Sequence, residues 1–119
     1  MKRILFVDDE ADLLFVSSIR LKKIGYEVFG AGDGQEALDL ARSIKPDLIV
    51  LDVFLPMMNG DEVAKILKKD EKLKRTPIIL ISADSKTLGK RTQESGANSY
   101  LTKPFESGEL VSIIRENIG

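Results

Sequence analysis

LIVLDVFLP, residues 48–56, is the stretch of this sequence that decides its fold. The run lies between Asp47 and Pro56 and carries almost only large apolar side chains, which predicts a strand buried on both faces. Asp52 marks the point at which this strand leaves the core. Because ligands of open α/β sheets bind beyond the carboxyl ends of the strands, we expect Asp52 to be the centre of a site. The alternative is that Asp52 only caps the turn that follows.

The composition limits what such a site can be. The chain has 119 residues, enough for one domain with an ordinary core. It has no cysteine and no histidine, which excludes disulfides, thiolate metal sites and the commonest general base. Its 18 basic and 19 acidic residues nearly cancel, so bulk charge does not favour direct binding of nucleic acid. The sequence has neither an apolar run of membrane-spanning length nor a signal-peptide pattern, so we expect a cytoplasmic protein without a membrane partner.

Strand and helix patterns alternate along the whole chain. Besides the Asp52 strand, apolar runs predict strands at residues 3–7, 26–31, 77–82 and 98–102, and helical patterns follow each strand. Five successive βα units predict a doubly wound α/β fold, a three-layer sandwich in which helices cover both faces of a parallel sheet. In the first helix, we expect the core face to carry Leu13, Val16, Leu21 and Ile24.

Polar side chains stand at the ends of four predicted strands: Asp8 and Asp9, Asp52, Ser82, and Lys103. The carboxyl ends of parallel strands share one edge, so these side chains can converge in one pocket. Oxygen ligands without histidine or cysteine favour Mg²⁺ before Ca²⁺. A cation and a lysine beside a carboxylate suit phosphoryl transfer, and a carboxylate can itself accept the phosphoryl group. The alternatives are helix capping by Asp8 and Asp9 and an ordinary surface lysine at position 103.

Over essentially its whole length, residues 1–119, the chain resembles response-regulator receiver domains of two-component signalling, the CheY-like superfamily. The motifs that carry the resemblance occur in order at suitable spacing: Val7-Asp8-Asp9-Glu10, Asp33-Gly34-Gln35-Glu36-Ala37, Leu51-Asp52, Pro56-Met57-Met58-Asn59-Gly60, Ile81-Ser82-Ala83, Gly96-Ala97 and Lys103-Pro104-Phe105. The resemblance implies a flavodoxin-like sheet of strand order 2-1-3-4-5.

The resemblance also implies a role for each site residue. Asp52 would be the phosphoacceptor, and Ser82 and Lys103 would bind oxygens of the phosphoryl group. The protein ligands of Mg²⁺ would be Asp9, Asp8, Asp52 and the backbone carbonyl of Phe54. Tyr100 would be an aromatic switch that turns inward when Ser82 moves, and the Lys103–Pro104 peptide is expected to be cis.

The family implies partners as well. A histidine kinase or histidine phosphotransfer protein would supply the phosphoryl group, and the fourth helix, fifth strand and fifth helix would contact a downstream protein. Phe15 and Ile19 lie opposite the expected core face of the first helix, where they are either ordinary exposed residues or a docking patch for the kinase. We expect a phosphoacceptor switch that catalyses only its own phosphorylation and dephosphorylation, as a monomer or weak dimer.

Three other functions remain open from the sequence. A Mg²⁺-dependent phosphohydrolase with an aspartate nucleophile usually needs a second acid two residues after that nucleophile, and here the position is Phe54. A flavodoxin-like cofactor binder would need a loop that cradles phosphate, but the loop after the first strand is acidic. A non-phosphorylated scaffold of the same fold would not need the complete acidic set. Phe54 is bulky for its position, and we expect it to shield the acyl phosphate from water.

Overall fold

Strands and helices alternate through the computed structural model, which describes residues 1–118; Gly119, the last residue of the predicted domain, lies outside the described residues. The strands are β1 Arg3–Val7, β2 Glu27–Ala31, β3 Leu48–Asp52, β4 Ile78–Ser82 and β5 Ser99–Thr102. The helices are α1 Ala11–Ile24, α2 Gly34–Ile44, α3 Gly60–Lys68, α4 Ser85–Ser95 and α5 Ser107–Ile118.

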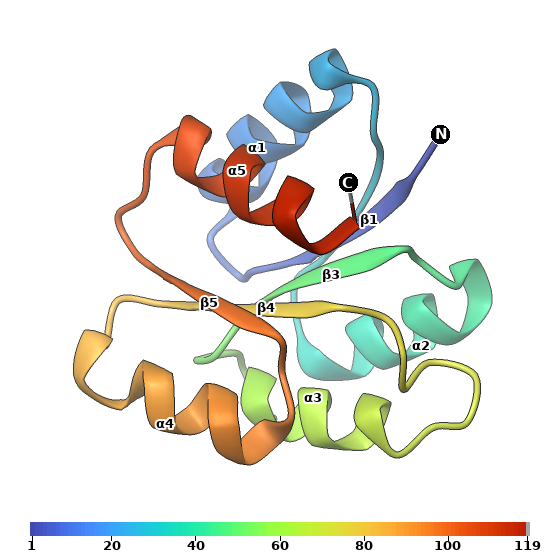
Figure 1. The fold of residues 1–119 in the computed structure, drawn as a ribbon, viewed down its shortest axis with the longest axis vertical. Coiled ribbons are helices and arrows are strands. Elements are labelled where there is room, and N and C mark those ends of the chain that lie inside the picture. Colours follow the sequence, from blue (N-terminus) through green and yellow to red (C-terminus); the bar gives the residue numbers. More distant parts are fainter. Residues whose placement is uncertain (119) are drawn as a thin grey trace.

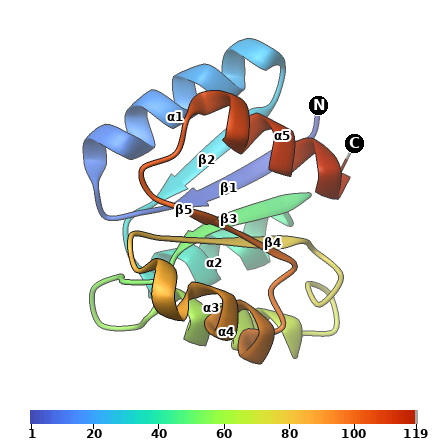
Figure 2. The ribbon, with the colours of Figure 1, turned by 60° about the vertical axis from the view of Figure 1, so that its left-hand side comes forward.

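The strands form a single parallel sheet of order β2-β1-β3-β4-β5, as the sequence and its resemblance predicted. Figures 1 and 2 show α1 and α5 on one face of this sheet and α2, α3 and α4 on the other. The predicted three-layer sandwich is therefore confirmed. No helix within residues 1–118 has the length and apolar character needed to cross a lipid bilayer.

β3 is the middle strand of the sheet, and every one of its side chains is buried. Successive side chains of a strand point to opposite faces, so β3 contributes to both halves of the core. Ile49 and Leu51 pack in the cluster under α2, α3 and α4, while Leu48 and Val50 pack in the cluster under α1 and α5. The apolar run that predicted this strand continues beyond it into a loop, where Val53 and Leu55 are also buried.

The orientation of α1 differs from the prediction. Val16 and Ile24, assigned to the core face, are 60% and 39% exposed. The helix instead packs through Leu14, Ser17 and Leu21, of which Ser17 and Leu21 are fully buried. The buried stripe of α1 is therefore narrower than the one expected from its apolar residues alone, and it includes a serine.

Candidate functional site

The carboxyl ends of β1, β3, β4 and β5 meet at one edge of the sheet, on the left of Figure 1, where β4 and β5 turn into their helices. Asp8 and Asp9 follow β1, Asp52 and Ser82 are the last residues of β3 and β4, and Lys103 follows β5. In the pairing of β3 with β4, Asp52 lies beside Ile81, so Ser82 is one residue further along the same edge.

Three carboxylates form a tight cluster at this edge. Asp8, Asp9 and Asp52 each offer an oxygen, and these oxygens lie within 4.8 Å of one another. Asp8 and Asp52 are buried, whereas Asp9 is exposed. Asp8 is not the N-cap of α1, which is Glu10; its Oδ1 accepts a 2.9 Å hydrogen bond from the backbone N–H of Glu10 and so fixes the turn that leads into the helix.

Lys103 lies among these carboxylates. Its Nζ is 2.8 Å from Asp8 Oδ2 and 3.4 Å from Asp52 Oδ2, and its side chain is only 12% exposed. A third partner is Glu10, whose Oε1 lies 2.8 Å from the same nitrogen. Glu10 belongs to a motif that carries the family resemblance, but no role for it was predicted from the sequence. Its position directly after the two aspartates was the signal that could have indicated a role.

The charges of the cluster do not cancel, and this alters how its groups ionise. Burial first, and then the charge of Asp8, raise the pKa of Asp52 to about 6, although Lys103 acts in the opposite direction. For Lys103, burial alone would lower the pKa, but contacts with Asp8 and Glu10 and the charge of Asp52 hold it above its usual value. Lys103 therefore stays protonated, while the Asp52 carboxylate is destabilised by its surroundings.

The donor set fits a hard divalent cation. Carboxylate oxygens are the ligands that Mg²⁺ takes in proteins, usually together with several waters. Within the described residues, the buried Oδ2 of Asp8 receives no hydrogen bond of good geometry, although Lys103 is close to it. A cation beside Asp8, Asp9 and Asp52 would satisfy that oxygen and offset the repulsion that raises the pKa of Asp52.

The loop between β3 and α3 is held against the phosphoacceptor candidate by a glycine. A side chain at Gly60 would collide with the backbone carbonyl of Asp52. The Gly60 N–H donates a 2.6 Å hydrogen bond to the carbonyl of Val53, which closes the loop. The same loop carries Phe54 two residues beyond Asp52, with its ring 46% exposed.

Ser82 and Tyr100, the two predicted switch residues, lie on β4 and β5, and both are close to α4. Ser82 is buried, and its Oγ accepts a 3.0 Å hydrogen bond from the N–H of Asp84, the N-cap of α4. Tyr100 is 49% exposed and so points outward. Its hydroxyl lies beside Gly89 of α4, where an added Cβ would be 3.8 Å away.

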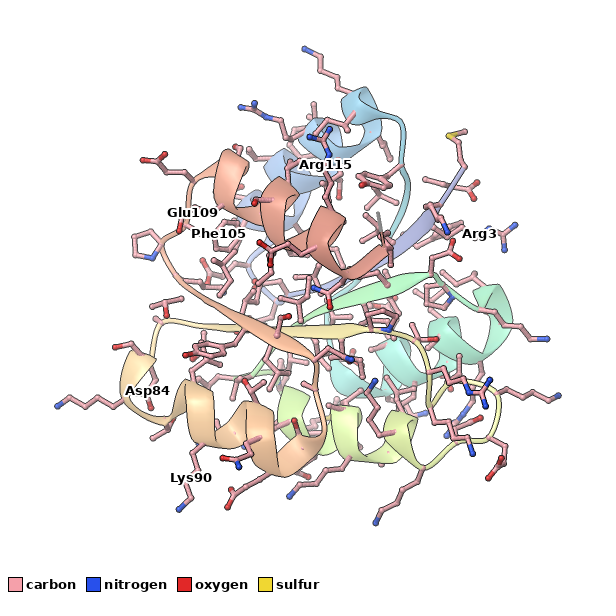
Figure 3. The ribbon with its side chains drawn as sticks, in the orientation of Figure 1. Arg3, Asp84, Lys90, Phe105, Glu109 and Arg115 are labelled. Atoms are coloured by element: carbon pink, nitrogen blue, oxygen red, sulfur yellow. The ribbon has the colours of Figure 1, made fainter. Side chains whose placement is uncertain are left out.

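Two further features of the predicted site are visible. The Lys103–Pro104 peptide is cis. Phe15 and Ile19 are 67% and 46% exposed on α1, so both side chains are accessible to a partner. Figure 3 places Asp84 at the start of α4 and Phe105 just before α5, at the edge that carries the acidic cluster.

A parallel α/β sandwich with three carboxylates and a lysine at its carboxyl edge defines a class of phosphoacceptor signalling domains. The model of the response regulator receiver domain matches residues 4–115, and the chain belongs to this family. It is thus a receiver domain of two-component response regulators, with the CheY-like fold.

Individual relatives and solved structures that resemble the chain are also response regulators. The chain is 39% identical to the DNA-binding response regulator MtrA of Mycolicibacterium paratuberculosis over 118 residues, which are 98% of this chain and 51% of MtrA. Chemotaxis response regulator CheY4 of Vibrio cholerae is 32% identical, with a TM-score of 0.93 over 99% of each chain. Response regulator TrrA of Thermotoga maritima, solved in complex with Mg²⁺ and BeF, is 35% identical, with a TM-score of 0.90 over 99% of this chain and all of TrrA. The chain spans about half the length of the curated relatives it matches.

Proposed function

We propose that the chain, as one receiver domain over residues 1–119, is a Mg²⁺-dependent switch that accepts a phosphoryl group on Asp52. The observation that carries the proposal is the cluster at the sheet edge, in which a buried carboxylate, two further aspartates and a protonated lysine lie together. The phosphoryl donor would be a phosphohistidine on a histidine kinase or phosphotransfer protein, and the phosphorylated domain would act through contact with a downstream protein.

Each side chain has a distinct task in the transfer. An oxygen of the Asp52 carboxylate forms a bond to phosphorus while the bond between phosphorus and the donor nitrogen breaks, and the donor keeps the electron pair of that bond. Lys103 pairs with a phosphoryl oxygen, and Ser82 Oγ–H donates a hydrogen bond to another. Mg²⁺, held by Asp8, Asp9, Asp52 and the backbone carbonyl of Phe54, would neutralise charge on the transferring oxygens.

The switch would follow from the movement of Ser82. Its Oγ accepts a hydrogen bond from the N–H of Asp84, which leaves its O–H proton available to a phosphoryl oxygen on Asp52 that would draw the side chain inward. Inward movement of Ser82 would leave room for Tyr100 to turn from its exposed position, and this would alter the surface formed by α4, β5 and α5. The free domain is expected to be a cytoplasmic monomer or weak dimer.

Phe15 and Ile19 support a docking role for α1. Both apolar side chains are exposed on α1, the helix that begins directly after Glu10. A kinase or phosphotransfer helix would cover them while it presents its phosphohistidine to Asp52. The domain itself would turn over no other substrate, and its catalysis would be limited to its own phosphorylation and dephosphorylation.

Intact-mass measurement tests the proposal. The chain is incubated with acetyl phosphate or phosphoramidate, with and without Mg²⁺, beside an Asp52→Asn variant. A single phosphoryl adduct that requires both Mg²⁺ and Asp52 is expected. An adduct that persists in the variant would place the acceptor elsewhere. No adduct despite measured Mg²⁺ binding would favour a non-phosphorylated scaffold.

A further inference from the structure

The helix α4 has little apolar attachment to the rest of the domain. Among its described residues, Leu88 is the one large apolar side chain that is buried. Thr92 and Ser95 are buried too, but their hydroxyls donate to carbonyls of the same helix, those of Leu88 and Thr92. The position of α4 therefore depends strongly on the polar contacts that it makes with its neighbours.

Arg91 of α4 makes such contacts with two other elements. Its Nη1 lies 2.9 Å from Asp61 Oδ2 on α3, and its guanidinium carbon lies 5.0 Å from the centre of the Phe54 ring. Its Nε donates a 3.1 Å hydrogen bond to Thr87 Oγ1, one turn earlier on α4. One side chain thus joins α4, α3 and the loop that follows Asp52, and Figures 1 and 2 show α3 and α4 side by side.

The surroundings of this contact make it stronger than an ordinary surface pair. The side chains of Arg91 and Asp61 are only 27% and 16% exposed, so water and salt screen them less than a fully exposed pair. Asp61 lies in the first turn of α3, where the helix dipole favours a negative charge. A guanidinium can pair with a carboxylate in its plane and cover an aromatic ring with its face, and both contacts are present.

We propose that Arg91 is a positioning residue that holds the Phe54 ring over the approach to Asp52 and so sets how fast the phosphoryl group is lost. Asp61 and Thr87 orient Arg91 for this task. The inference rests on the proposed function and extends it to residues outside the acidic cluster. It also connects the lifetime of the phosphoryl group to the position of α4, because a displacement of this helix carries Arg91 away from Phe54.

The reaction concerned is hydrolysis of the acyl phosphate. A water oxygen forms a bond to phosphorus, the bond between phosphorus and the Asp52 oxygen breaks, and inorganic phosphate, the free carboxylate and one proton are released. Phe54 takes no part in these bond changes. Its ring limits the access of water, and Arg91 limits the movement of the ring.

A double-mutant cycle between Arg91 and Phe54 tests the inference. The variants Arg91→Met, Phe54→Leu and the double variant are loaded with acetyl phosphate and Mg²⁺, the donor is removed, and loss of the adduct is followed by intact mass. Arg91→Met is expected to lose the phosphoryl group about 2- to 5-fold faster, the change that one exposed cation–aromatic contact supports. In the Phe54→Leu background, Arg91→Met is expected to cause no further increase in the rate of phosphoryl loss.

Two controls separate positioning from charge and from folding. Lys90→Met removes the same charge from the next position of α4, where the side chain projects away from the molecule (Figure 3), and should leave the rate unchanged. Arg91→Lys keeps the charge beside Asp61 but loses the planar contact with Phe54, so it should accelerate phosphoryl loss less than Arg91→Met does. This variant still tests the inference if Arg91→Met does not fold.

A second readout needs neither phosphate nor Mg²⁺. The chain has no tryptophan, so Phe54→Trp introduces a single tryptophan reporter at the contact. Arg91→Met should shift the emission of this reporter, and Lys90→Met should not. Equal dephosphorylation rates with and without Arg91, or equal acceleration in the presence and absence of Phe54, would overturn the role of Arg91 alone. Failure of the parent chain to form any adduct would overturn the proposed function, and this inference with it.

Discussion

Asp52→Asn is expected to stabilise the domain at neutral pH when no divalent cation is present. Burial and the neighbouring aspartates raise the pKa of Asp52 from 3.8 to about 6 in the folded state. The folded protein therefore binds this proton more tightly than the unfolded chain does. The charged carboxylate imposes no penalty below pH 3.8, the penalty grows between pH 3.8 and 6, and it is complete above that range.

The size of the effect follows from the same shift. A difference of about 2 pKa units corresponds to roughly 3 kcal/mol, and water that reaches the edge of the sheet reduces this to an expected gain of about 1–3 kcal/mol for the asparagine variant. Each kcal/mol should raise the melting temperature by roughly 4 °C for a domain of this size. Urea and thermal unfolding in EDTA at pH 7.5 and at pH 4.5 measure the gain and its loss on acidification.

Asp84→Asn is a control, because its expected effect on the stability of the domain has the opposite sign. Hydrogen bonds from Thr87 and from the backbone at the start of α4 hold the pKa of Asp84 below its usual value. Its charge therefore contributes stability above the unfolded pKa, so its removal should destabilise the domain at pH 7.5. The reasoning about Asp52 is refuted if Asp52→Asn is no more stable than the parent at pH 7.5 in EDTA, or if its advantage is the same at pH 4.5.

Three other variants probe the site and its surroundings. Gly60→Ala should destabilise the domain by about 1–3 kcal/mol in urea unfolding and slow phosphorylation, because the new methyl group collides with the Asp52 carbonyl; full stability would show that the loop yields. Phe54→Asn should release the phosphoryl group severalfold faster by intact mass, and an unchanged or slower rate would contradict shielding. Phe15→Ser with Ile19→Ser should slow transfer from the cognate kinase by about 10-fold, equivalent to ~1.4 kcal/mol, but leave acetyl phosphate unaffected; equal slowing with both donors would exclude docking.

Features that depend on one local pattern were predictable from the sequence. The unbroken apolar run of residues 48–51 predicted a strand buried on both faces, and every residue of β3 is buried. Asp8, Asp52 and Lys103 were identified because each follows a strand and parallel strands share one carboxyl edge. The strand order came from the family resemblance, since alternation of strands and helices alone allows other orders.

Features that depend on how separate helices pack were not predictable. Val16 and Ile24 were assigned to the core because they are apolar, yet both are exposed, whereas the polar Ser17 is buried. The contact of Arg91 with Asp61 joins residues on different helices, and no periodicity along the chain indicates such a pair. Glu10 lay within a recognised motif, but its role required the position of Lys103 from the far end of the chain.

The charges around Asp52 explain why phosphorylation should depend strictly on a divalent cation. Lys103 already forms ion pairs with Asp8 and Glu10 at 2.8 Å, so its positive charge is largely offset before a phosphoryl group is added. A phosphoryl group on Asp52 carries roughly one and a half to two negative charges where the carboxylate carried one, so phosphorylation adds up to about one further negative charge beside Asp8 and Asp9. The lysine can orient one phosphoryl oxygen, but it cannot also neutralise the cluster. Burial and the charges of Asp8 and Asp9 raise the pKa of Asp52, so the repulsion that destabilises its carboxylate is also the repulsion that a bound Mg²⁺ would relieve.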